Sequence, residues 1–161
     1  MKMKNKLIIL NSREIKEIRN LVIKQFGYFL EKKYAFLRND KNKIFVVNKD
    51  LSQINLDNLI IERIGLYFAE FKPNQVRLSK EGAQLLYLEA KKNGQELINL
   101  VDLSKEETKT YFLGVDLIKD LGVESRLIIL KYGDQILGCA KYKETKILNF
   151  LPKTHRGEVI L

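Results

Sequence analysis

The stretch from Leu127 to Lys141, LIILKYGDQILGCAK, constrains the fold more than any other part of the sequence. Two short apolar runs, Leu127 to Leu130 and Ile136 to Ala140, flank a polar segment that contains Gly133-Asp134. Apolar runs of this length around a Gly-Asp pair are typical of two strands joined by a tight turn. The last third of the chain is therefore predicted to contain a β-hairpin with buried strands.

A capped helix is predicted just before this hairpin. The hydroxyl of Ser104 can accept a hydrogen bond from a free N–H at the start of a helix, and Glu107 can reach back to the Ser104 N–H. Phe112-Leu113-Gly114 ends the helix with a residue that can take positive φ, and a second glycine turn follows at Leu121-Gly122. A helix, a turn and a hairpin are thus expected in this order.

Two further helices are predicted in the N-terminal part. Residues 11–26 place apolar side chains at helical spacing before the stop signal Gly27, and residues 79–92 do the same before Asn93-Gly94. The end of the second helix is the predicted domain boundary, which divides the chain into residues 1–92 and 93–161.

Strands are predicted between and after these helices. Turn-forming residues 39–42 separate two strand-like runs, and residues 59–71 are expected to form one bent strand or two strands around Gly65. The remaining strands are predicted at residues 76–78, 96–101, 147–151 and 158–161. We therefore expect an α+β fold, with a mixed N-terminal domain and a small C-terminal pseudo-β-barrel that carries helices.

The charge of the chain favours a polyanionic partner. Its formal net charge is +9 and its pI is about 9.5. Residues 1–92 hold 19 Lys/Arg against 10 Asp/Glu, whereas residues 93–161 hold 10 of each. The last residues nevertheless concentrate lysines and an arginine opposed only by Glu144 and Glu158. The alternative interpretation is a lysine-rich surface that only water covers.

Aromatic residues beside these cations suggest how RNA would be held. Tyr132 and Tyr142 both stand among lysines, where exposed rings can stack on bases, but each can equally be half-buried with only its hydroxyl in water. His155 lies in a basic loop where it can touch phosphate. The predicted RNA-binding residues are Lys131, Tyr132, Lys141, Tyr142, Lys143, Lys146, Lys153, His155 and Arg156.

The sequence offers little for catalysis. With one cysteine, Cys139, and one histidine, His155, the chain can form neither an internal disulfide nor a Cys/His metal site, and Cys139 is predicted to be a small core residue. No glycine-rich phosphate-binding loop is present, and Asp116 and Asp120 are interpreted as surface charges or caps rather than acid/base catalysts. We therefore expect no enzyme activity, no cofactor and no metal.

Apolar runs are too short for a membrane span of roughly 18 residues or for a secretory signal. The expectation is a cytoplasmic protein without a membrane partner.

Several segments resemble a PUA domain, the module named after pseudouridine synthases and archaeosine transglycosylases. They are residues 110–117 (TYFLGVDL), the Leu121-Gly122 turn, residues 136–141 (ILGCAK) and Arg156-Gly157-Glu158. Upstream, residues 64–71 (IGLYFAEF), residues 76–79 (VRLS) and the helix ending at Lys92 resemble the pre-PUA domain of the nuclear import protein seven (Nip-seven) family of ribosome-biogenesis proteins. The compact, lysine-rich chain favours an archaeal member.

This resemblance implies a noncatalytic RNA-binding factor for assembly of the large ribosomal subunit and processing of its precursor rRNA. RNA would be held by the C-terminal domain, with ribosome-assembly proteins as further partners. The basic surface of the family carries over onto Lys141 and Lys143, and less directly onto Lys153 and Arg156.

Other functions remain open. PUA-like modules also serve as accessory or targeting subunits of RNA-modification enzymes, because a fold does not fix a function. An enzyme acting alone is a third hypothesis. The N-terminal lysines, Lys32, Lys33, Lys41 and Lys43, either extend the rRNA contact or meet an acidic assembly partner.

Overall fold

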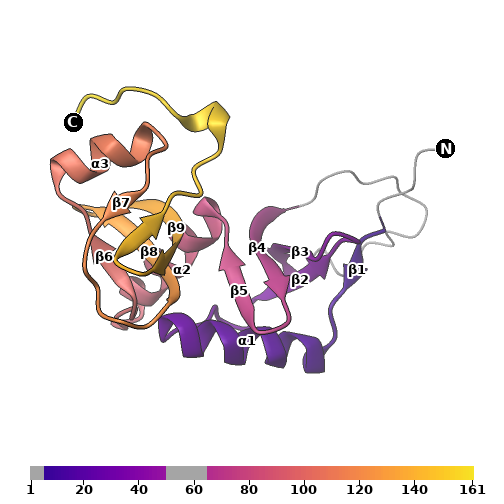
Figure 1. Cartoon of the computed structure of the whole chain (residues 1–161). Coiled ribbons are helices and arrows are strands. Elements are labelled where there is room, and N and C mark those ends of the chain that lie inside the picture. The colour runs from indigo at the N-terminus through magenta and orange to yellow at the C-terminus, as the bar shows by residue number, and fades with distance from the viewer. Residues whose placement is uncertain (1–5, 50–64) are drawn as a thin grey trace.

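The structure, a computed structural model, describes residues 6–49 and 65–161. The described residues form two sheets that lie side by side (Figure 1). The first sheet has the order β1-β2-β3-β4-β5, and all its neighbours are antiparallel. Its strands are β1 (Ile8–Ile9), β2 (Tyr34–Arg38), β3 (Lys43–Asn48), β4 (Leu66–Lys72) and β5 (Gln75–Leu78).

The second sheet has the order β6-β8-β9-β10-β7. Only the pair β6 and β8 is parallel, and the predicted hairpin is β8 with β9. A register shift between Leu130 and Lys131 marks an irregularity in this hairpin. The strands are β6 (Leu100–Asp102), β7 (Leu117–Ile118), β8 (Arg126–Tyr132), β9 (Gln135–Lys143) and β10 (Lys146–Leu148).

Three α-helices complete the described fold: α1 (Ser12–Phe26), α2 (Lys80–Lys92) and α3 (Lys105–Phe112). Asn11 caps α1 in a reciprocal pair with Glu14, and Gly27 ends this helix at φ 82°. Ser104 and Glu107 form the predicted capping box of α3. The three predicted helices are confirmed, because caps and apolar periodicity are local signals. None of the described helices is long and apolar enough to cross a bilayer.

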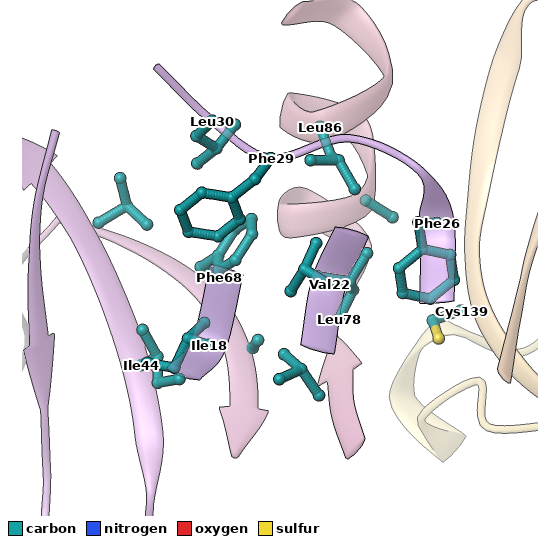
Figure 2. Close-up of a cluster of buried hydrophobic side chains, with 14 of the residues drawn as sticks. Ile18, Val22, Phe26, Phe29, Leu30, Ile44, Phe68, Leu78, Leu86 and Cys139 are labelled. Carbon is teal, nitrogen blue, oxygen red and sulfur yellow. The ribbon is translucent and has the colours of Figure 1, made fainter. Parts of the chain in front are cut away.

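The core runs through both halves of the molecule. Helix α1 lies along the first sheet and reaches the second (Figure 1). At the end of α1, Phe26 meets Cys139 of β9 within one buried cluster (Figure 2). Leu127 and Ile129 of β8 join this cluster. Residues from both sides of the predicted 92/93 boundary therefore share one core.

The opposite face of the second sheet is buried as well. Ile128 and Leu130 of β8 point into a second cluster, which includes Tyr111 of α3. Side chains alternate between the faces of a strand, so the continuous run Leu127 to Leu130 supplies both cores. Burial on two faces explains why this run is uniformly apolar rather than alternating.

Several strand predictions need correction. β1 was not expected, because two residues carry no periodic signal. The strand expected at residues 158–161 is wrong: the segment is without strand structure, and Ile160 is fully exposed. The strand expected at residues 147–151 is the short β10, and the one expected at residues 96–101 begins only at Leu100. Residues 59–64 of the predicted bent strand lie outside the described residues.

Candidate nucleic-acid interface

The β9–β10 hairpin carries a concentrated positive charge. Glu144 and Thr145 form its two-residue turn with φ of 50° and 62°, the positive values typical of tight hairpin turns. This turn sets Lys143 directly opposite Lys146. Like charges at facing positions repel one another, so the hairpin tip keeps an unfavourable pair that a bound anion would relieve.

Among the residues that the structure describes, these lysines lack a counter-ion. In the described part of the chain, no carboxylate lies within ion-pair distance of Lys141, Lys143 or Lys146. Lys119 at the neighbouring edge differs, because its Nζ lies 3.1 Å from Glu107. Lys143 and Lys146 are exposed, and Lys141 is partly buried. The three lysines are thus available to phosphate groups; we call them the hairpin lysines.

The predicted residues Lys131 and Tyr132 lie at the end of β8, next to the start of β9, whereas the hairpin lysines lie at the end of β9 and in β10. A nine-residue strand is ~27 Å long, so this end is far from the hairpin lysines. Lys131 Nζ lies 2.6 Å from Asp102, and the hydrogen bond that the ammonium donates to this carboxylate raises the Lys131 pKa. The adjacent turn places Asp134 3.6 Å from Lys91 of α2. Acidic neighbours make this end a weaker phosphate site.

Tyr142 is a core residue, and its predicted role in base stacking is wrong. The side chain has no exposed surface and belongs to the second cluster. Its hydroxyl donates to the Gly122 carbonyl at 2.6 Å and accepts from the Leu121 N–H at 2.9 Å. The tyrosine thus fixes the Leu121-Gly122 turn. Tyr132 is partly buried against the same cluster.

The predicted residues of the C-terminal segment have two different settings. Lys153 and His155 lie on an exposed 3-10 turn, η2 (Lys153–His155). Arg156 donates from Nε to the Leu151 carbonyl at 3.0 Å and packs over Gly114, whose φ is 83°. Arg156 therefore fastens the segment to the end of α3, while Lys153 and His155 remain free to contact a ligand.

A cleft of about 330 Å³ lies between the two sheets. The guanidinium of Arg77 on β5 stacks on the ring of Phe150, with 3.8 Å between Cζ and the ring centroid. Lys43 on β3 lies 5.2 Å from the ring centroid of Tyr67 on β4. The lining also includes Glu70, Leu78, Ser79, Lys80, Glu81, Tyr111, Leu137, Gly138, Cys139, Leu151, Pro152 and His155.

Of the predicted RNA-binding residues, only His155 lines this cleft. Sequence reasoning missed Arg77 and Phe150 because they come from segments far apart in the chain. The one local signal was a cation between two apolar residues in the run Val76-Arg77-Leu78.

Cys139 is another residue that lines the cleft. Its side chain is buried, and burial raises the pKa of the thiol to about 12, although backbone hydrogen bonds act in the opposite direction. The prediction of a core cysteine is confirmed. In the described residues, no cluster of three or more His, Cys, Asp or Glu side chains is placed to hold a metal ion.

Comparisons with known proteins identify a PUA-like domain. Residues 98–156 match the family model described as the methyltransferase RsmF PUA domain. The hypothetical protein PH0734.1 from the hyperthermophilic archaeon Pyrococcus horikoshii OT3 has a similar structure, with a TM-score of 0.54 over 95% of this chain and 90% of that chain. The two sequences are 14% identical, so this similarity concerns the fold. No curated protein sequence gives a significant match.

These findings confirm the predicted α+β fold with a PUA-like domain in its C-terminal part. They do not identify the Nip-seven family.

Proposed function

We propose that this chain is a noncatalytic RNA-binding factor in assembly of the large ribosomal subunit. The observation that carries the proposal is the PUA-like match over residues 98–156, since a PUA domain suggests RNA binding. The hairpin lysines lie inside this region. Under this proposal, the chain is a cytoplasmic, archaeal member of the Nip-seven family. Its partners are precursor rRNA and ribosome-assembly proteins.

The hairpin lysines supply a simple mode of binding. Lysines at phosphates position the RNA and release counter-ions, so affinity falls as salt rises. Lys143 of β9 and Lys146 of β10 are cross-strand partners, so they present two cations side by side. Such a surface holds RNA with little preference for sequence, because phosphate contacts carry no sequence information.

A second function is supported by the same match. The family model describes the PUA domain of a methyltransferase, which favours an accessory subunit that delivers tRNA or rRNA to a modification enzyme. The two functions predict different partners in the cell: assembly proteins and precursor rRNA for the first, and a modification enzyme with its RNA for the second.

Crosslinking in native cell extract, followed by sequencing of the RNA attached to this chain, separates these functions. Adducts in large-subunit rRNA that map near the hairpin lysines are expected. Adducts mainly on tRNA or guide RNA would replace the first function by the second. Recovery of no RNA above the level of a non-binding control protein would contradict both.

The noncatalytic role has its own test. The purified chain is incubated with total RNA and donor substrates, and modified nucleosides are measured by mass spectrometry. No new modification is expected, and turnover by the chain alone would contradict the proposal.

A further inference from the structure

We propose that the cleft between the two sheets is a pocket for one nucleotide of the bound RNA, turned out of its strand. This inference rests on the proposed RNA-binding function and adds a second contact site that both halves of the chain build. β3, β4, β5 and the start of α2 contribute from one half. α3, β9 and the segment from Phe150 to His155 contribute from the other, where the C-terminal segment passes over the junction (Figure 1).

The size of the cleft fits a single nucleotide. Its volume of about 330 Å³ lies at the lower end of the range of about 300–1,000 Å³ in which small ligands bind. A duplex is far wider than such a cleft. Unpaired RNA differs, because its bases can leave the stack and enter protein pockets.

Arg77 and Phe150 provide a preorganised stacking surface. The guanidinium lies in direct contact with the ring, with 3.8 Å between Cζ and the ring centroid. Both residues line the cleft, and Arg77 is only partly buried, so this pair can offer a surface to a base. Unpaired bases in protein complexes rest on aromatic rings and on arginine planes of this kind. Arg77 has no carboxylate partner among the described residues.

Cations around this surface can hold the phosphate of the same nucleotide. Lys43 lies over Tyr67, and Lys80 is exposed at the first position of α2. The N–H groups in the first turn of a helix lack intrahelical acceptors and favour anions. Two acids oppose these cations, but Glu70 is paired with Lys72 at 3.6 Å. Glu81 is exposed and can accept from the amino group of a base.

β9 connects the pocket with the hairpin lysines. Gly138 lines the cleft, and Lys143 lies five residues further along the same strand. This separation is ~17 Å, which corresponds to about five nucleotides at their stacked spacing. One short single strand can therefore reach both sites at once.

The test uses the full-length chain and a single-stranded RNA of about twelve nucleotides, with and without one base removed from its sugar. R77Q is compared with R13Q, which removes an exposed arginine of α1 outside the cleft. Loss of a base-stacking contact lowers affinity by about 5- to 150-fold. We expect this loss for R77Q with the intact RNA and no loss for R13Q. For R77Q, base removal should have no further effect.

R77K separates stacking from charge and guards against misfolding. It keeps the cation but loses the flat guanidinium, so its binding should retain the salt dependence of the wild type and lose the effect of base removal. In addition, RNA containing 4-thiouridine should crosslink to Tyr67 or Phe150 in the wild-type chain.

The outcomes separate the pocket from the proposed function. Equal affinities of R77Q and the wild type, together with reduced binding by variants of the hairpin lysines, would overturn the pocket and leave RNA binding intact. Failure of the wild-type chain to bind any RNA would instead overturn the proposed function.

Discussion

The facing lysines Lys143 and Lys146 show how one residue pair can favour ligand binding over stability. Their repulsion costs the free protein a little stability, and a phosphate between them would remove that cost. K143E replaces the repulsion by attraction, so the free energy of unfolding should rise by about 0.5 kcal/mol while RNA affinity falls. Denaturant unfolding and RNA titration measure the two effects.

Neutral variants provide the control. K143Q should give an intermediate stability, and K143Q with K146Q should reduce the slope of log affinity against log salt by about 1.4 for single-stranded RNA. An unchanged affinity at two salt concentrations would show that the hairpin lysines do not contact RNA.

Tyr142 differs from this lysine pair, because it contributes to the stability of the fold and not to ligand binding. Y142F keeps the ring but leaves the Leu121 N–H and the Gly122 carbonyl without their partner. The free energy of unfolding should fall by about 1–2 kcal/mol, and RNA affinity of the folded variant should not change. Reduced affinity at full stability would restore a direct RNA role for this tyrosine.

At the scale of elements, α3 is held by charge as well as by packing. Burial raises the pKa of Glu107, but hydrogen bonds from the Ser104 N–H and from Lys119 outweigh burial, so the pKa lies below its ordinary value. The folded state therefore favours the ionised carboxylate. This stabilisation is complete above the ordinary pKa and is lost as the pH falls through the lowered one.

E107Q should consequently weaken the acid dependence of stability. Melting temperatures of the wild type and E107Q are compared from neutral pH downwards, and the difference between them should shrink below about pH 5. E106Q is a matched control, because Glu106 is exposed in the same helical turn and forms no ion pair among the described residues. A constant difference across this pH range would contradict the role of Glu107.

Elements with local signals could be predicted from the sequence, whereas those defined by partners could not. The caps at Asn11 and Ser104 fix the helix starts, and Gly133-Asp134 fixes the turn of the β8–β9 hairpin. β1 exists only because β2 pairs with it, and residues 159–161 are apolar but find no strand partner. The site followed the same rule: adjacent lysines were found, but the Arg77–Phe150 stack required the tertiary fold.

At the scale of the whole molecule, the two sheets depend on one another. Leu127, Ile129 and Cys139 of the second sheet are buried against residues of the N-terminal half. A fragment of residues 93–161 should therefore expose apolar surface, bind hydrophobic dyes and unfold without a cooperative transition. The full chain should unfold in one transition that circular dichroism and tyrosine fluorescence report alike. A fragment with native-like cooperative unfolding would show two independent domains.

The position of Cys139 beside Phe26 in the shared core makes this thiol a probe of how often the structure opens. The lone thiol sits where the halves meet, and its raised pKa leaves almost no thiolate while it is covered. Because only 7% of Cys139 is exposed, a thiol reagent should modify it mainly when the structure opens, so the labelling rate should report these openings. RNA that contacts both halves should slow that labelling rate. The rate at one sulfur atom would then measure how strongly bound RNA holds the two halves together.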